Sequence, residues 1–375
     1  MFIEQGPIRP PSEAASLLIR VTRNCPWNRC AFCRTYKGEK FSRRSVEEVL
    51  SDVNTVREVS EQVKKISWEL GCGGEIDAEV VHQAGARHGH LHYHVAAWLY
   101  SGGKSVFLQD ANSLIVKTDD LARVVSHVKE SFPAVDRMTT YARADTAARK
   151  TEDELRQLRQ AGLNRIHMGM ESGADVVLKM IQKGITAAQL EEAGRKIKAA
   201  GISLCWYIMP GLGGGQYSRE HALETAARVN AVNPDHVRFR TLSVLKGTTL
   251  HDMQAGGEFE PLDEDQIVTE QRLFIESLQG VTTRIVSDHI LNLLQELEGR
   301  LPGDRDRMLG IIDHYLAMSG EEKANFQMGR RAGVYNSMDD MRHPAKHGYV
   351  EGLLKDAGGA GGLKKHLEKV RRRFV

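Results

Sequence analysis

Cysteine, long apolar runs and net charge are all scarce in this chain of 375 residues. Its five cysteines are sparse and odd in number, and no signal peptide precedes them, so a disulfide framework is disfavoured and a cytoplasmic location is expected. No apolar run approaches the roughly 20 residues that a membrane-spanning helix needs, so we expect no membrane partner. A formal net charge of +2 does not by itself indicate a nucleic-acid partner, although it leaves one open.

Basic residues concentrate in the C-terminal tail. Lys364, Lys365, Lys369, Arg371, Arg372 and Arg373 follow a glycine run at residues 358–362, which is typical of a flexible linker. Cationic side chains at a helix C-terminus interact favourably with the helix macrodipole. The alternative is that the tail forms a patch for RNA or for an acidic partner.

Short apolar runs alternate with longer amphipathic ones, which predicts repeated strand–helix units around a parallel sheet and an α/β fold class. The predicted strands cover residues 16–22, 104–109, 137–142, 165–170, 202–209 and 236–242, with a seventh near 283–287. The predicted helices cover residues 43–65, 119–131, 151–161, 173–182, 187–200, 217–231 and 263–278. A parallel barrel carries its catalytic groups at the carboxyl ends of its strands, so those ends are where a site is expected.

Three of the five cysteines, Cys25, Cys30 and Cys33, lie within nine residues of one another. Three thiolates can bind three irons of a four-iron cubane and leave the fourth iron open to a substrate or cofactor. A structural zinc site needs four ligands, usually from two cysteine pairs. The chain has no second pair, although a histidine could supply a fourth ligand.

The cysteine loop and four later motifs resemble the radical SAM superfamily. The loop has the spacing Cys-x4-Cys-x2-Cys, with Phe32 before the last cysteine. The later motifs follow in the order of the branch that contains anaerobic coproporphyrinogen oxidases, methylthiotransferases and the elongator catalytic subunit. They lie at residues 108–114 (LQDANSL), 169–173 (GMESG), 209–214 (MPGLGG) and 246–250 (KGTTL). The resemblance covers about residues 15–285.

The resemblance implies an incomplete (β/α)6-type TIM barrel of the radical SAM type with a helical C-terminal extension. We expect the core barrel over residues 1–287, with an insertion at 66–103. The extension is expected over 288–357, where the sequence predicts helix only, followed by the glycine-rich linker and basic tail over 358–375.

The resemblance also implies an activity, that of an oxidoreductase working under anaerobic conditions. An external low-potential electron donor of the flavodoxin or ferredoxin type would reduce a 4Fe-4S cluster held by the three cysteines. S-adenosyl-L-methionine (SAM) would be cleaved to methionine and a 5′-deoxyadenosyl radical that abstracts hydrogen from an unidentified substrate. Only Cys72 and Cys205 remain, which disfavours subclasses with a second cluster. The alternatives are a radical SAM methyl or group transferase acting on a small molecule or RNA, and a non-enzymatic iron–sulfur carrier.

Several residues at predicted strand ends are expected to contact SAM. His167, Gly169 and Glu171 share one face of a strand, where Glu171 could accept hydrogen bonds from the ribose hydroxyls or be an ordinary surface carboxylate. In similar enzymes, a cation that binds the SAM carboxylate occupies the position of Lys183. The further members of the expected SAM-binding set are Phe32, Gln109, Asp110, Asn112, Tyr141, Ser172 and Tyr207.

Phe32 is expected to shield the cluster and the adenine, and five other members have an expected role and an alternative. Gln109, Asp110 and Asn112 supply acceptors for an ammonium group, or form only a polar turn. Tyr141 and Tyr207 pack on the nucleoside, or are ordinary core tyrosines. The Gly-Gly-Glu sequence at residues 73–75 resembles another SAM-amine motif, but the preceding residues form a poor strand, so we favour the turn at Gln109.

Two arginines alternate on the sixth predicted strand. Arg238 and Arg240 would point together, opposite Val237 and Phe239, and two buried cations need an anion. That anion is either the SAM carboxylate, a substrate carboxylate or phosphate, or an internal Asp or Glu. Asp288 and His289 open a helix after the seventh strand, with His289 as an acid or base or Asp288 as a simple cap.

Residues 88–94 (HGHLHYH) carry four histidines at alternate positions. A helix would pair His88 with His92 and His90 with His94, and a strand would place all four on one face. Either geometry could bind a divalent metal. The flanking apolar positions favour a helix with exposed histidines.

Overall fold

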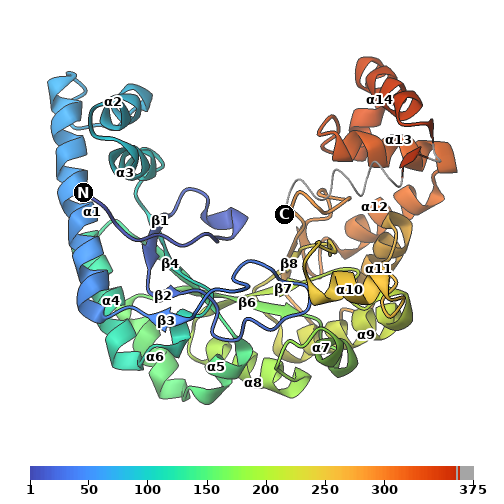
Figure 1. The fold of residues 1–375 in the computed structure, drawn as a ribbon, viewed down its shortest axis with the longest axis horizontal. Helices are drawn as coiled ribbons and strands as arrows, with labels where there is room; N and C mark the ends of the chain where they lie inside the picture. The colour runs from blue at the N-terminus through green and yellow to red at the C-terminus, as the bar shows by residue number, and fades with distance from the viewer. Residues whose placement is uncertain (360–361, 364–375) are drawn as a thin grey trace. The chain divides into compact units, whose positions relative to one another are not determined.

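The computed structural model describes residues 1–359 and 362–363. The basic side chains predicted for the tail, and part of the glycine run, lie outside the described residues. One eight-stranded sheet has the order β1-β4-β5-β6-β7-β8-β9-β10 (Figure 1). Its strands are β1 (Leu17–Arg20), β4 (Ser105–Gln109), β5 (Arg137–Ala142), β6 (Arg165–Glu171), β7 (Ser203–Ile208), β8 (His236–Phe239), β9 (Arg284–Val286) and β10 (Gly299–Arg300). The predicted α/β class with a largely parallel sheet is confirmed.

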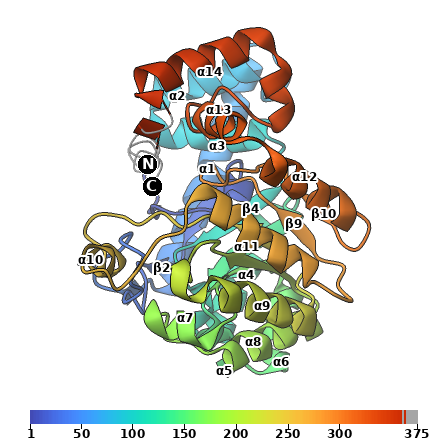
Figure 2. The same cartoon turned by 90° about the vertical axis from the view of Figure 1, so that its right-hand side faces the viewer.

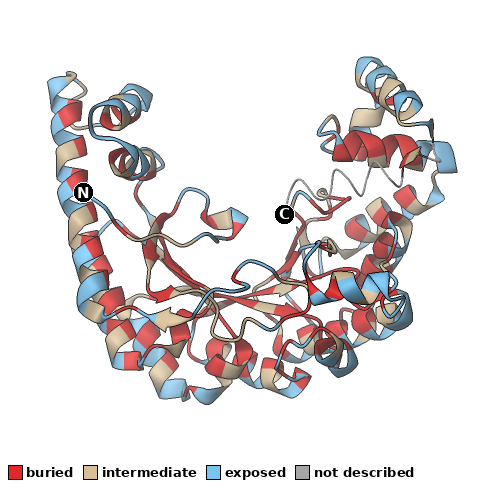
Figure 3. Cartoon of the chain, viewed as in Figure 1, coloured by how far each residue is buried: buried red, intermediate tan, exposed pale blue. Residues whose placement is uncertain are grey.

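The chain forms two compact units. The first unit comprises Met1–Asn28, Tyr36–Met168 and Glu192–Leu204, and the second comprises Arg29–Thr35, Gly169–Glu191 and Cys205–Val375. The strands are coloured almost entirely as buried or intermediate in Figure 3. The predicted domain limits at residues 287 and 357 stay predictions.

In the first unit, β1 pairs with β4 and β4 pairs with β5, both in parallel. Its helices are α1 (Val46–Glu69), α2 (Ala78–His88), α3 (His90–Tyr100), α4 (Thr118–Ser131), α5 (Ala144–Arg149) and α6 (Glu152–Ala161), and α8 (Ala187–Ala199) has its later part there. Local sequence explains where they begin. Ser45 and Glu48 form a capping box at α1, and Thr151 and Glu154 form one at α6. Figure 1 shows α2 and α3 beside α1; both lie within residues 66–103, whose assignment as an insertion stays a prediction.

In the second unit, β7, β8 and β9 are parallel, and Tyr207 and Arg238 are register partners. Its helices are α7 (Asp175–Met180), α9 (Gly214–Val232), α10 (Thr249–Ala255), α11 (Glu264–Glu276), α12 (Arg305–Ala317), α13 (Gly320–Arg331) and α14 (Pro344–Asp356). Helices α9 and α11 pack side by side (Figure 2). No described helix is long and apolar enough to cross a membrane.

Three sequence predictions of secondary structure are wrong in detail. The strand predicted over 16–22 is split, because Thr22 and Arg23 form β2 (Thr22–Arg23) and pair with β3 (Ser42–Arg43) in a separate sheet. The strand predicted over 236–242 ends at Phe239. The neighbouring chain segment there contains Pro210, whose carbonyl accepts from the Leu242 N–H but which has no N–H of its own to continue the strand pairing. The region after 288 is not helix only, since β10 pairs antiparallel with β9.

The histidine stretch is helical, interrupted at Gly89 between α2 and α3. The rings of His88 and His92 stack, and those of His90 and His94 meet edge-on, as the helical pairing predicts. His92 departs from the expectation of exposed histidines because it is buried, with Nε2 2.6 Å from Gln62 Oε1.

Candidate functional site

The loop that carries Cys30 and Cys33 is fixed through its backbone in the second unit. The Ala31 N–H donates to the Ile181 carbonyl at 2.8 Å, and the Leu250 N–H donates to the Ala31 carbonyl at 2.9 Å. Ala31 is fully buried in an apolar cluster with Val177, Ile181 and Leu250. A small side chain at position 31 therefore lets the loop lie flat on this cluster between the two cysteines.

The three cysteines of the predicted cluster form no disulfide bonds. Cys30 is buried, and Cys33 and Cys25 are half-buried, with Cys25 in the first unit. The Asn28 N–H lies 3.4 Å from Cys25 Sγ. Within residues 1–359 and 362–363, no three His, Cys, Asp or Glu side chains are grouped to hold a metal ion. The donor set itself, three soft cysteine sulfurs, fits an iron–sulfur cluster.

Glu171, Lys183 and Phe32 come together in the second unit. Lys183 Nζ lies 2.8 Å from Glu171 Oε1 and 5.9 Å from the centre of the Phe32 ring. Gly169 makes room for the pair, since a Cβ there would lie 2.2 Å from Glu171 Oε1. Glu171 also adopts a φ of +62°, an uncommon value for a residue with a side chain. The end of β6 thus holds a nearly buried ion pair on strained backbone.

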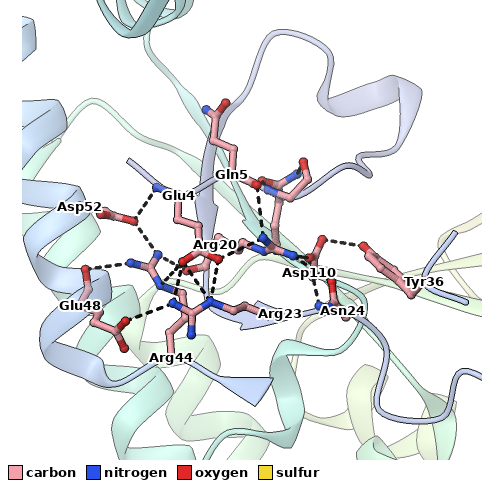
Figure 4. Close-up of polar contacts among 12 residues, drawn as sticks. Glu4, Gln5, Arg20, Arg23, Asn24, Tyr36, Arg44, Glu48, Asp52 and Asp110 are labelled. Atoms are coloured by element: carbon pink, nitrogen blue, oxygen red, sulfur yellow. Dashed lines mark hydrogen bonds and ion pairs between the residues drawn. The ribbon is translucent and has the colours of Figure 1, made fainter. Parts of the chain in front are cut away.

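The turn after β4 is occupied by the chain's own contacts in the first unit (Figure 4). Asp110 Oδ2 accepts from Arg20 Nε at 2.9 Å and from Nη2 at 2.6 Å, and Oδ1 accepts from the Tyr36 hydroxyl at 2.8 Å. Burial and the charge of Asp110 raise the pKa of Tyr36. Gly6 passes so close that a Cβ there would lie 2.2 Å from Asp110 Oδ1. This carboxylate is therefore enclosed by protein donors.

The two neighbours of Asp110 in the predicted ammonium site are also bonded internally. The Gln109 amide accepts from the Gly6 N–H at 2.9 Å and donates to the carbonyls of Gly6 and Ile8. Asn112 donates to Thr146 Oγ1 at 2.9 Å and accepts from the Arg143 N–H. Both side chains hold the N-terminal segment and the turn in place, and both are fully buried.

A series of hydrogen-bonded polar side chains in the second unit was not predicted from the sequence. His221 Nδ1 lies 2.8 Å from Ser172 Oγ, and its Nε2 lies 3.6 Å from Glu270 Oε1. Glu270 accepts from the Gly211 N–H at 2.7 Å and from the Ser218 hydroxyl at 2.6 Å. These bonds connect the motif after β6, the motif after β7 and helices α9 and α11.

The sequence gives only a weak signal for these hydrogen-bonded polar side chains. His221 is one histidine on an amphipathic helix, which is more often a core residue than a functional one. Only Ser172 and Gly211 belong to recognisable motifs. Ser172, His221 and Glu270 are buried, and His221 and Glu270 line a small cavity together with Ile208, Pro210, Phe239 and Phe274.

The remaining predicted residues lie on strands β5, β7 and β8 or just beyond β8 and β9. Tyr141 packs edge-on against Phe107, with ring centres 5.0 Å apart, and Tyr207 lies beside Arg238 across the β7–β8 ladder. Arg238 is buried and forms an ion pair with Asp288. The Gly-Gly-Glu sequence at 73–75 lies in the turn between α1 and α2, not at a strand end.

Comparison with known proteins identifies the class. Residues 92–228, less than half of the chain, match the profile of the Radical SAM superfamily, whose members are enzymes. The superfamily implies a 4Fe-4S cluster, SAM and an electron donor. The matched region begins after the cysteine loop, so the roles of Cys25, Cys30 and Cys33 stay predictions.

The more particular similarities are distant. A tRNA uridine(34) acetyltransferase of Methanocaldococcus infernus is 26% identical over 119 residues, which is 32% of this chain and 22% of that protein. Its counterpart in Methanocaldococcus jannaschii is 25% identical over 118 residues, 31% of this chain and 22% of that protein. The match thus spans about a fifth of the curated relatives' length. Methylornithine synthase has a TM-score of 0.42 at 18% identity, covering 78% of this chain and 76% of that one.

Proposed function

We propose that this protein reductively cleaves SAM at a 4Fe-4S cluster held by Cys25, Cys30 and Cys33, and uses the resulting 5′-deoxyadenosyl radical to abstract hydrogen from a substrate. The observation that carries the proposal is the group of Glu171, Lys183 and Phe32 beside the anchored cysteine loop. The bond from the Ala31 N–H to the Ile181 carbonyl places this loop two residues along the chain from Lys183.

Glu171 and Lys183 supply what the two ends of SAM need. The Glu171 carboxylate accepts from the ribose hydroxyls, and the Lys183 ammonium binds the carboxylate of the methionine portion. Their side chains are only 11% and 10% exposed, so each charge needs a partner, and without SAM they pair with each other. Phe32 covers the Lys183 side of the site.

The other proposed SAM contacts have differing support. Tyr207 and Tyr141 offer aromatic surface at their strands, while Ser172 is held by His221 and so also positions the end of β6. Asp110 and Asn112 each retain an acceptor lone pair for the SAM ammonium, but both are fully buried. A flavodoxin or ferredoxin is the proposed electron donor.

A second candidate comes from the relatives, whose names state that they acetylate a tRNA uridine. On this alternative, the chain is a radical SAM group transferase acting on RNA. A non-enzymatic iron–sulfur carrier is disfavoured, because electron transfer alone has no use for the Glu171–Lys183 pair.

The test is anaerobic reconstitution with iron and sulfide, followed by assays of bound iron and of 5′-deoxyadenosine formed from SAM with dithionite. The wild type should hold about four irons per chain, and Cys30→Ala should lose both the iron and the product. Cys72→Ala is the matched control, because Cys72 lies outside the loop, and it should behave as wild type. Full activity in Cys30→Ala, or none in the wild type with four irons bound, would refute the proposal.

A further inference from the structure

The segment after β8 and the turn after β9 are locked together in the second unit by one buried amide. Asn292 Nδ2 donates to the Phe239 carbonyl at 2.9 Å, and its Oδ1 accepts from the N–H and the hydroxyl of Thr241, each at 2.9 Å. The Asn292 N–H donates to the His289 carbonyl at 2.9 Å. Arg240 lies between the two clamped residues, so it is held next to the turn that carries His289.

The position of the Phe239 ring shows in which direction the side chains of Arg238 and Arg240 point. The Phe239 ring meets Phe274 of α11 edge-on, with centres 5.6 Å apart, so Phe239 faces that helix. The Arg240 N–H donates to the Ile208 carbonyl at 2.9 Å, which keeps this segment extended. Side chains alternate along extended backbone, so Arg238 and Arg240 both face away from α11. Asp288 meets Arg238 on that same side.

The charges of this group do not cancel. Arg238 is paired with Asp288, and the nearby Arg331 is paired with Glu264, whose Oε1 lies 2.7 Å from Arg331 Nη2. Within residues 1–359 and 362–363, Arg240 forms no ion pair, and its side chain is exposed. The group therefore presents one uncompensated guanidinium, which has five N–H donors and no acceptor.

His289 adds a neutral donor beside this cation. Its Nδ1 accepts from the Leu291 N–H at 3.3 Å, so in the neutral ring the proton lies on Nε2. Burial, followed by the charge of Arg240, lowers the pKa of His289 to about 4, and the ring is neutral near pH 7. Two donor groups and a single positive charge suit one negatively charged oxygen-bearing group.

We propose that Arg240 and His289 form an oxyanion subsite that binds a carboxylate or phosphate group of the substrate. The statement that the bound molecule is a substrate rests on the proposed function. Arg238 and Asp288 act as positioning residues, because their ion pair fixes strand β8 against the turn and leaves Arg240 as the free cation. A cationic or purely apolar substrate group is excluded at this place by the donors that line it.

The test uses the full chain and two simple probes, acetate and inorganic phosphate, titrated at pH 7. Binding is followed by the nuclear magnetic resonance signal of the His289 ring, assigned with His289→Gln. We expect a saturable shift with at least one probe, and at least tenfold weaker binding in Arg240→Gln. Arg284→Gln is the control, because it removes an exposed arginine of the same unit, and it should titrate as wild type. Arg240→Lys should fall between the two, since Lys lacks the planar fork.

Each outcome of the titration decides the inference. A response to acetate alone assigns a carboxylate, and a response to phosphate alone assigns a phosphate. No response in the wild type, or an equal response in Arg240→Gln, overturns the subsite. Assays of 5′-deoxyadenosine on the same preparations keep this result separate: SAM cleavage without an anion response refutes the subsite alone, and an anion response without SAM cleavage refutes the proposed function alone.

Discussion

Two carboxylates at the ends of strands, Asp110 after β4 and Glu171 at the end of β6, differ in how fully the protein satisfies them. Asp110 is completely buried, and it accepts bonds from two nitrogens of Arg20 and from the Tyr36 hydroxyl. Among the residues that the structure describes, Glu171 forms an ion pair with Lys183 alone, and it lies on backbone with a φ of +62°. A carboxylate with many internal donors stabilises the fold, so we infer that Asp110 is structural and that Glu171, on strained backbone, is the carboxylate available to a ligand.

The surroundings of the two residues support this distinction. Around Asp110, Glu4 of the N-terminal segment forms ion pairs with Arg20 and Arg23 (Figure 4). Arg44 forms a further ion pair with Asp52. Around Glu171, the missing side chain at Gly169 makes room for the Glu171 carboxylate and the Lys183 ammonium, whose atoms would lie 2.2 Å and 3.0 Å from a Cβ there. The first region is a closed network, and the second is a pair of opposite charges that a zwitterionic ligand could separate.

The largest effect is expected from breaking the closed network. Asp110→Ala removes one of the two carboxylate partners of the nearly buried Arg20, which keeps its ion pair with Glu4, and it also removes the acceptor of Tyr36. Breaking a buried pair on one side costs about 3–5 kcal/mol, so the free energy of unfolding in urea should fall by that amount. Glu171→Ala, measured in the same way, should lose clearly less. If the two variants are equally destabilised, the distinction between a structural and a ligand-binding carboxylate is wrong.

The opposite ranking is expected for ligand binding. Glu171→Ala should weaken SAM binding by roughly 1.5–3 kcal/mol, because one charge-assisted hydrogen bond is lost, and should leave the iron content unchanged. Glu171→Gln is the matched control: it keeps the shape and one acceptor, so it should lose less. Equilibrium binding of SAM to the reconstituted protein measures both. If Glu171→Ala binds SAM with unchanged affinity, Glu171 does not contact the ribose of SAM.

Sequence reasoning could predict the strands and the glutamate, because both follow from local patterns. Strands alternate with capped helices along the chain, and Gly169 and Glu171 lie in one short motif. It could not predict that Asp110 is enclosed, since its partner Arg20 lies 90 positions earlier in the chain. His221 and Glu270 were missed for the same reason, because each becomes informative only when helices α9 and α11 bring them together. The early end of β8 depends on Pro210 in a neighbouring segment.

The smallest expected effect concerns pH and the outer part of the closed network. Hydrogen bonds from Arg23 lower the pKa of Glu4 in the folded protein below its ordinary value of 4.5. A carboxyl whose pKa is depressed by folding stabilises the protein above its unfolded pKa, and that contribution is lost as the pH falls through the folded pKa. Glu4→Gln should therefore lower the free energy of unfolding at pH 7 by about 0.5–1.5 kcal/mol.

The variant and the wild type should converge on acidification, because protonation removes the same charge that the substitution removes. Urea denaturation between pH 7 and pH 3 measures the difference at each step. Glu39→Gln, which removes an exposed carboxylate outside the network, should track the wild type throughout. A gap between Glu4→Gln and the wild type that stays constant down to pH 3 would mean that Glu4 acts through packing rather than through its charge. The N-terminal segment would then be held mainly by the Gln109 amide, and the ionic part of the network around Asp110 would end at Arg20.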